Sequence, residues 1–308
     1  MSWRRKSVLG GIVLKSKVFI SDIVFDIIKW LFLIFFFLAT LYPILNTLAI
    51  SFNDGLDAIR GGIYILPREF TLDNYRSVLS KSSLLTGAYN TVLRTVIATI
   101  SQLFLTSLLA FVLSRKEFMF RTPITLLFIF TMYFNAGLIP NYLWLNRLGF
   151  TNTFWVYVIP GMISAFNLLV IRTYIRGIPE SLVESAQIDG AGYLTIFMKV
   201  IIPLCKPVLA TVALFIAVGQ WNSWFDTMIY NGFNERYTTL QYELMKLLSS
   251  VTSQGANPND VKNAGGSMVT PTSIRAATTI ITALPIVCLY PFLQRYFISG
   301  LTIGGVKE

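Results

Sequence analysis

The side chains that most enzymes use for chemistry are scarce in this 308-residue chain. It has no histidine, and its two cysteines, Cys205 and Cys288, both lie in apolar stretches. A disulfide framework and a Cys/His metal site are therefore both excluded. The chain also lacks the G-x-x-x-x-G-K-[ST] run whose backbone cradles nucleotide phosphates. We expect no catalytic residue, no metal site and no cofactor bound by the chain itself.

One segment does carry an informative spacing of acidic, small and apolar residues. The tripeptide Glu184-Ser185-Ala186 is followed by three residues and Gly190, and then by nine residues and the run Val200-Ile201-Ile202-Pro203. Pro179 favours the start of a helix, and the run from Gly190 to Gly192 favours its end. The pattern predicts a short helix, a tight turn and a second helix.

Apolar residues line one face of each helix in this segment. An apolar surface that faces water needs a partner to cover it. The run Ser181-Leu182-Val183-Glu184 also fits a capping box. Glu184 therefore has two open roles, which are a helix cap and a contact to that partner. The apolar residues are Leu182, Val183 and Ala186 in the first helix and Tyr193, Phe197, Val200 and Leu204 in the second.

The composition of the whole chain is that of a membrane protein. Hydrophobic residues make up 54% of it and charged residues 13%, against about 25% charged residues in a soluble domain. The mean hydropathy is +0.63. The net charge of +10 does not indicate nucleic acid, because the basic residues sit in short runs beside apolar segments, where orientation signals belong. We therefore predict one compact, all-α membrane domain.

Six apolar stretches are long enough to cross a bilayer as helices, which takes roughly 20 residues. Because six crossings put both termini on one side, the distribution of Lys and Arg decides which side. The N-terminal tail and the short loop 114–123 hold most of the excess, so we place both termini in the cytoplasm. Arg94, near one end of the second stretch, is expected to reach the headgroups. The stretches are Trp30–Ile50, Thr91–Leu113, Ile124–Leu143, Phe154–Ile171, Leu204–Ile229 and Ala276–Phe297.

This layout places the helix–turn–helix segment on the cytoplasmic side. Two sizeable loops, about 53–85 and 230–273, lie outside, and the turn-rich run 253–260 in the second is expected to be mobile. The chain then divides into a cytoplasmic or interfacial N-terminal segment 1–29, a six-helix membrane domain 30–299 with the cytoplasmic loop at about 176–203, and a C-terminal tail 300–308.

The segment at Glu184 resembles the EAA loop, which is the signature of ABC importer permeases. The family pattern reads E-A-A, three residues, G, nine residues and I-x-L-P. In this chain Ser185 replaces the middle Ala, Val200 the Ile and Ile202 the Leu, and the spacing is intact. The run from Ala186 to Ala191 looks like the carbohydrate-uptake branch of the family. The six-span layout extends the resemblance over nearly the whole chain.

The resemblance implies an ATP-driven importer of a carbohydrate or oligosaccharide in the bacterial plasma membrane. In that family the loop docks in a cleft on a cytoplasmic ATPase that binds ATP and magnesium, so this chain would not itself be an enzyme. The implied partners are a second homologous permease, two copies of the ATPase, an extracellular solute-binding protein facing the loop 230–273, and membrane lipid, with no nucleic acid. The implied coupling residues are Glu184, Ser185, Ala186, Asp189, Gly190, Gly192, Phe197 and Pro203.

Polar and aromatic residues inside the apolar stretches are candidates for substrate contacts. Aromatic faces stack on sugar rings and amides bond hydroxyl groups, so this combination suits a carbohydrate. The same residue types also form interfacial aromatic belts or bond neighbouring helices, and both interpretations stay open. The candidates are Tyr133, Asn135, Trp221, Asn222 and Trp224.

Three other functional classes stay open. An importer permease for peptides or another solute would share the same loop. An ion-coupled transporter or channel favours acidic or basic relays inside the membrane, and the stretches are nearly free of acidic residues except Asp226 at an edge. A membrane scaffold without a pathway is the third class.

Overall fold

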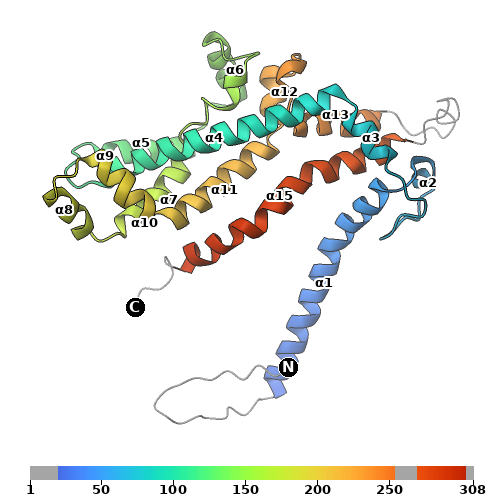
Figure 1. Ribbon diagram of the computed structural model, residues 1–308, viewed down its shortest axis with the longest axis horizontal. Helices are drawn as coiled ribbons and strands as arrows, with labels where there is room; N and C mark the ends of the chain where they lie inside the picture. The colour runs from blue at the N-terminus through green and yellow to red at the C-terminus, as the bar shows by residue number, and fades with distance from the viewer. Residues whose placement is uncertain (1–19, 254–268, 303–308) are drawn as a thin grey trace.

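The computed structural model describes residues 20–253 and 269–302. Every named element within these two ranges is a helix, which confirms the all-α prediction. The segment before residue 20, the turn-rich run from residue 254 on and the tail from residue 303 lie outside the described residues. The helices form one elongated bundle from which the first helix, α1 (Ile20–Ser51), splays away (Figure 1).

Three helices in the described ranges are long and apolar enough to cross a membrane. They are α1, α4 (Ser82–Ser114) and α15 (Pro271–Thr302), and they match the first, second and sixth expected stretches. Two further pairs of helices pass the same test only when each pair is taken together, which raises the number of crossings to at most five. Continuous helices are thus found for three of the six expected stretches.

The third expected stretch, Ile124–Leu143, is a bent pair rather than one helix. The helices α5 (Arg121–Tyr133) and α6 (Leu138–Arg147) meet at an angle of 119°. Gly137 turns the chain between them with a φ of 90°, a conformation that glycine adopts without a steric cost. The Gly137 amide also donates to Asn135 Oδ1 at 2.9 Å, which fixes this turn.

The fourth expected stretch, Phe154–Ile171, also does not form one helix. A single 3₁₀ turn, η1 (Phe154–Tyr157), is separated from α7 (Ala165–Arg176) by a non-helical segment that contains Pro160 and Gly161. Proline cannot donate a helical hydrogen bond and glycine is a poor helix former, so their pairing interrupts the apolar run.

The fifth expected stretch, Leu204–Ile229, is broken at both ends. The segment Tyr193–Leu204 meets α11 (Lys206–Asn222) at 84°, where Pro207 in the first turn of α11 suits the start of a new helix. At its other end α11 stops at Asn222, and α12 (Phe225–Asn231) follows after two residues outside any helix. The break places Asp226 in the first turn of α12.

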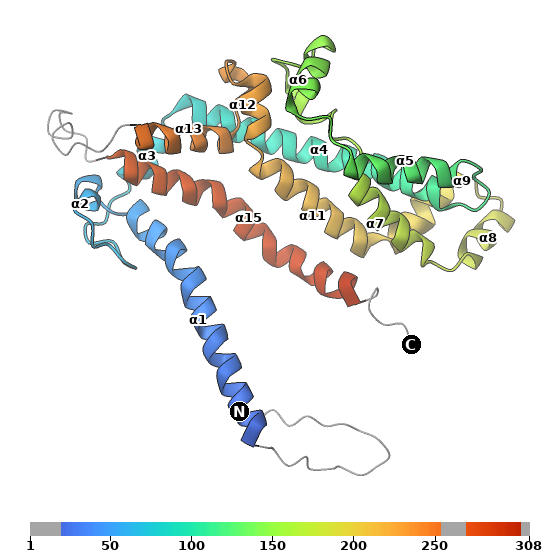
Figure 2. The ribbon, with the colours of Figure 1, turned by 180° about the vertical axis from the view of Figure 1, so that it is seen from behind.

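The bundle has two ends, which we call the α3 end and the α8 end (Figures 1 and 2). The short turn η3 (Glu235–Tyr237) leads into α13, and α13 packs against α4 and α15. The α3 end holds α2 (Gly55–Ile59), α3 (Asp73–Leu79) and α13 (Leu240–Ser253). The α8 end holds α8 (Ser181–Ile188), α9 (Tyr193–Ile196), the π-helical turn Phe197–Ile201 and α10 (Ile202–Leu204).

The main core lies where α4 packs against α7 and α11. Since lipid is as apolar as these side chains, close packing and hydrogen bonds between helices hold such a bundle together. The core extends without interruption into the segment at the α8 end, so that segment is fixed to α4. Core side chains without measurable exposure are Ala110, Leu113, Leu168, Ile171, Ile196, Phe197 and Val212.

Helix α4 also holds the segment 236–240, which follows α12. The Asn90 side-chain amide donates to two backbone carbonyls of this segment, each at 2.8 Å. The Thr91 hydroxyl accepts a hydrogen bond from one of its backbone amides at 2.9 Å. A Cβ atom at Gly87 would come within 2.9 Å of the backbone there, so the close approach requires glycine. These contacts fix α12 relative to α4.

Candidate functional site

The segment around Glu184 folds as a helix, a turn and a second helix, as the sequence predicts. Helix α8 ends at Ile188, and Gly190 takes the left-handed conformation with a φ of 80°. The amide of the next residue, Ala191, donates to the Ala186 carbonyl at 2.9 Å, which closes the turn. Glycine is the common residue at this position because a Cβ atom would strain the left-handed backbone. We call residues 180–204 the coupling loop, after the family segment that they resemble.

The inner face of the coupling loop is anchored in the core. Val183, Ile196 and Phe197 are buried there. The Phe197 ring lies 5.6 Å from the ring of Phe111 and 6.2 Å from that of Phe104, both on α4. Phe197 therefore connects the loop to the longest core helix instead of presenting its ring on the loop surface.

The outer face of the coupling loop is apolar and uncovered. Ile188 is 86% exposed and Leu194 is 66% exposed. Ala186 is half-buried because its side chain packs against the core. No part of the described chain covers these apolar side chains, and an exposed apolar surface of this kind is typical of a contact with another molecule. The other exposed residues of the motif are Glu184, Ser185, Asp189, Gly190, Gly192 and Pro203.

The Glu184 carboxylate is not used as a helix cap. The N-cap residue of α8 is Glu180, no side-chain hydrogen bond caps the helix, and Ser181 is already inside it. The capping-box interpretation is therefore wrong, because α8 begins one residue too early for it. Within the described residues we find neither a hydrogen bond nor an ion pair to the Glu184 carboxylate, which leaves it available to a partner.

Glu180 instead braces the start of α8. Its carboxylate forms an ion pair with Lys116, which lies in the short connection between α4 and α5. The hydrogen bond from Lys116 holds the pKa of Glu180 below its usual value, and the nearby charge of Arg115 acts in the same direction. The coupling loop is thus attached to α4 by Phe197 and to the connection that follows α4 by this pair.

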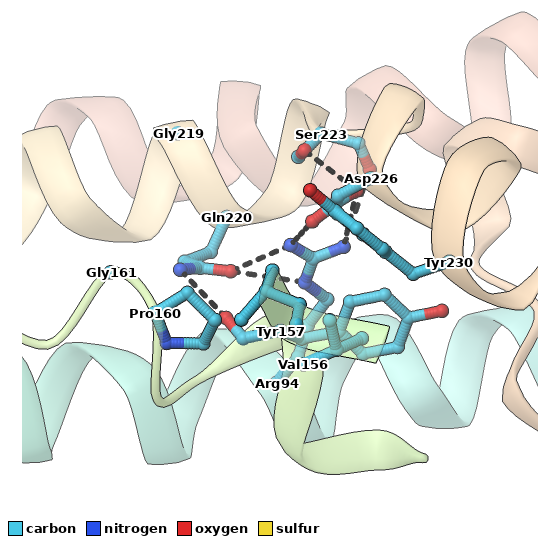
Figure 3. A pocket seen from close by; sticks show the side chains of 11 residues that line it. Arg94, Val156, Tyr157, Pro160, Gly161, Gly219, Gln220, Ser223, Asp226 and Tyr230 are labelled. Carbon is cyan, nitrogen blue, oxygen red and sulfur yellow. Dashed lines mark hydrogen bonds and ion pairs between the residues drawn. The ribbon is translucent and has the colours of Figure 1, made fainter. Parts of the chain in front are cut away.

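A second region, deeper in the bundle, gathers charged and polar groups (Figure 3). Arg94 on α4 is 1% exposed. Its guanidinium forms an ion pair with Asp226 at the start of α12 and donates to Gln220 Oε1 on α11, with Nε at 3.0 Å and Nη2 at 2.8 Å. The expectation that Arg94 reaches the headgroups is wrong, because these partners are supplied inside the protein.

The surroundings of Arg94 satisfy both members of the ion pair. The Tyr157 ring faces the guanidinium, with 4.3 Å between its centre and the central guanidinium carbon. Asp226 Oδ1 accepts from the Ser223 hydroxyl at 2.9 Å and from the Thr227 amide at 2.8 Å. A buried ion pair is tolerated only when its remaining hydrogen-bonding positions are filled. The cluster therefore joins α4, η1, α11 and α12 as one polar unit.

A cavity of about 270 Å³ opens beside this cluster. Gln220 and Tyr157 face it, and Tyr230 contributes an aromatic wall that stacks on Tyr142 with 6.0 Å between ring centres. Amide, hydroxyl and aromatic groups together can bond hydroxyl groups and cover the apolar face of a ring. The other lining residues are Arg94, Leu145, Val156, Pro160, Gly161, Gly219, Ser223 and Asp226.

The five pathway candidates from the sequence lie elsewhere. Trp221 is half-buried, and its indole N–H donates to the Thr282 carbonyl of α15 at 2.9 Å. Trp224 packs edge-on against Phe225 with 5.7 Å between ring centres. None of the five lines the cavity. The remaining three, Tyr133, Asn135 and Asn222, are exposed.

Sequence reasoning missed the Arg94 cluster although a signal was present. Arg94 and Asp226 are charged residues within apolar stretches, and such residues usually face a protein interior or a cavity. Their pairing was hidden because 132 positions separate them along the chain.

Comparison with known proteins finds relatives along almost the whole chain. Residues 82–303 match the family model described as "Binding-protein-dependent transport system inner membrane component". The chain is 33% identical to the polygalacturonan/rhamnogalacturonan transport system permease protein YtcP of Bacillus subtilis (strain 168), over 92% of this chain and 98% of the relative. It is 37% identical to protein LplC of the same organism, over 92% and 95%.

A solved structure shares the fold. It is a crystal structure of a bacterial ABC transporter involved in the import of the acidic polysaccharide alginate. The similarity has a TM-score of 0.84 with 29% sequence identity and covers 92% of this chain and 100% of that chain.

Proposed function

Because this chain belongs to the family of binding-protein-dependent transport system inner membrane components, we propose that it carries a carbohydrate through the bacterial plasma membrane as the permease subunit of an ABC importer. The names of the relatives support the substrate class, since they refer to polygalacturonan, rhamnogalacturonan and alginate. The observation that carries the proposal is the coupling loop, with an exposed apolar face and an available carboxylate beside a turn that needs glycine.

In this proposal the coupling loop docks in a cleft on a separate ATPase subunit, which binds ATP and magnesium. Ile188 and Leu194 supply the apolar contact and Glu184 meets a basic group of the ATPase. Ser185, Ala186, Asp189, Gly192 and Pro203 belong to the same docking segment, and Gly190 keeps its turn. Phe197 acts behind the surface, because its buried ring passes movement of the loop to α4.

The proposed topology has six crossings with both termini in the cytoplasm. The bent pair α5 with α6 forms one crossing, η1 with α7 forms another, and α11 forms a third, with α9 and α10 left on the cytoplasmic side as part of the coupling loop. The α8 end then faces the cytoplasm, and the α3 end with the loop 230–273 faces the binding protein. A second homologous permease and two ATPase copies complete the complex.

The cavity beside Arg94 is the proposed contribution of this chain to the substrate pathway. Gln220, Tyr157 and Tyr230 supply the groups that would contact a sugar. The exposed residues Tyr133, Asn135 and Asn222 are proposed to complete the pathway together with the second permease, with Trp221 and Trp224 as supports behind it. Arg94 and Asp226 hold the cavity walls and are already satisfied by each other.

Uptake by the purified complex in vesicles tests this proposal. The permease pair, the ATPase and a sugar-loaded binding protein are combined, and entry of the oligosaccharide is followed with ATP present or absent. We expect uptake that needs both ATP and the binding protein. Uptake that follows an ion gradient without ATP would contradict the proposal and support an ion-coupled transporter.

A further inference from the structure

Three arginines from two helices meet at the α8 end. Arg121 is the first residue of α5, and Arg172 and Arg176 lie in the last turns of α7. The two helices pack against each other, and both of these helix ends lie beside the coupling loop (Figures 1 and 2). Arg172 and Arg176 are four residues apart on one face of α7, Arg172 is bonded to the end of α4, and α5 begins at Arg121 seven residues after α4 ends, so the three arginines lie in one region of the α8 end.

The positive charges of these three arginines are not paired with carboxylates in the part of the chain that the structure describes. In residues 20–253 and 269–302, none of the three arginines forms an ion pair with a carboxylate. Arg172 is half-buried, and its Nε donates to the Leu113 carbonyl at 2.9 Å, which orients the guanidinium. The neighbouring Glu180 is already paired with Lys116. Like charges held together at partial burial are unfavourable unless an anion lies among them.

The surface next to the arginines is apolar. Met119 is 77% exposed and Phe120 is 53% exposed, directly before α5 begins. On α5 itself, Leu126 and Leu127 are 59% and 61% exposed. A molecule that covers this region therefore needs an anionic group for the arginines and an apolar body for α5.

We propose that Arg121, Arg172 and Arg176 bind the phosphate of an acidic phospholipid, whose acyl chains lie along the exposed apolar face of α5. The planar guanidinium group matches phosphate oxygens with two parallel hydrogen bonds. Basic pockets between membrane helices on the cytoplasmic side are suited to acidic headgroups. The inference rests on the proposed function in one respect, which is that the α8 end is the cytoplasmic end of a membrane protein.

The bound lipid would sit next to α8, the helix that meets the ATPase in the proposed mechanism. The Arg172 guanidinium contacts the last turn of α4, and the coupling loop is anchored to the same helix through Phe197. An acidic lipid there would stabilise the arrangement of α4, α5 and α7 that supports the loop. Membrane composition is thereby linked to the stability of the coupling region.

Lipid binding to the purified transporter tests the proposal. Native mass spectrometry compares phosphatidylglycerol with phosphatidylcholine on the assembled complex, and the midpoint of thermal unfolding is recorded with each lipid. The variant Arg121→Gln/Arg176→Gln removes two charges and keeps Arg172 with its bond to Leu113. We expect the wild type to prefer phosphatidylglycerol over phosphatidylcholine. In the double variant this preference should fall about fivefold for each arginine removed.

A matched variant and two soluble anions complete the design. Arg147→Gln/Arg236→Gln removes two exposed arginines away from the α8 end and should keep the preference. Inorganic phosphate and inorganic pyrophosphate at millimolar concentration should not displace phosphatidylglycerol; displacement would show a soluble phosphate site and overturn the lipid assignment. Equal binding of both lipids by the wild type, or an unchanged preference in the Arg121→Gln/Arg176→Gln variant, would also overturn it. No transport is measured, so failure here is separate from failure of the proposed function.

Discussion

The coupling loop and the Arg94 cluster use charge in opposite ways. The cluster buries an arginine and fills the hydrogen-bonding positions of its partner Asp226 from within the chain. The coupling loop leaves the Glu184 carboxylate and the side chains of Ile188 and Leu194 uncovered. A satisfied buried pair acts within the fold, whereas an open carboxylate on an apolar surface awaits another protein. Variants in the first region should therefore change stability, and variants in the second should change transport.

The largest effect on stability is expected from Arg94→Gln. This change leaves Asp226 with its charge in a largely enclosed site, and removing one partner of such a pair costs about 3 kcal/mol. The midpoint of thermal unfolding in detergent measures it. The double variant Arg94→Gln/Asp226→Asn removes both charges and should recover most of the loss. A single variant as stable as the wild type would show that the pair does not hold α12 to α4.

Glu184→Ala should give the largest loss of transport with intact folding. The carboxylate has no partner within the described residues, so the stability should change by less than about 0.5 kcal/mol. We expect ATP-dependent uptake to fall about tenfold or more, since a charge-assisted contact to the ATPase contributes roughly 1.5–3 kcal/mol. Asp26→Asn removes an exposed acid on α1, outside both proposed docking surfaces, and serves as the control. Equal uptake by both variants would remove Glu184 from the docking contact.

The turn of the coupling loop offers a sharper pair of variants. Gly190 has a φ of 80°, whereas Gly192 has a φ of −71° with no atom near the position of a Cβ. Gly190→Ala should cost about 1 kcal/mol through backbone strain and lower uptake by misplacing α8. Gly192→Ala should leave both quantities close to the wild type. Equal effects of the two changes would mean that the turn conformation is unimportant for coupling.

The smallest effect is expected from lowering the pH, which breaks the ion pair between Lys116 and Glu180 at the start of α8. Since Lys116 holds the pKa of Glu180 below its ordinary value of 4.5, the ionised pair stabilises the fold above that pH. This contribution is lost as the pH falls through the lowered pKa. The protection factors of the α8 amides, which correct exchange for its intrinsic pH dependence, should fall with acid in the wild type, and Lys116→Gln should show the lower protection already at neutral pH. Identical exchange in both proteins would exclude the brace.

Local residue spacing was enough to predict the helix–turn–helix of the coupling loop. The long-range pairing of Arg94 with Asp226 could not be predicted in this way. The helix stop at Gly190 follows from residues within one turn, and the structure confirms it. Arg94 and Asp226 meet only because α12 is fixed against α4 by contacts such as those of Asn90. The position of Phe197 was also missed, because helical spacing gives its face but not which face is buried.

The apolar stretches were recognised more reliably than their helices. Length and hydropathy identified α1, α4 and α15 correctly. They failed at Pro160 and Gly161 and at the turn around Gly137, where local backbone chemistry interrupts an apolar run. Hydropathy reports the surroundings of a segment, whereas proline and glycine determine whether it continues as one helix.

Photo-crosslinking from the coupling loop tests the central claim most directly. A photoreactive phenylalanine analogue replaces Ile188, which is 86% exposed, and in a control it replaces Phe233, an exposed residue after α12. The assembled transporter is irradiated and the crosslinked chains are identified. We predict a crosslink to the ATPase from position 188 and no crosslink to the ATPase from position 233. A crosslink from position 188 to the binding protein, or no crosslink from it to the ATPase, would contradict this prediction.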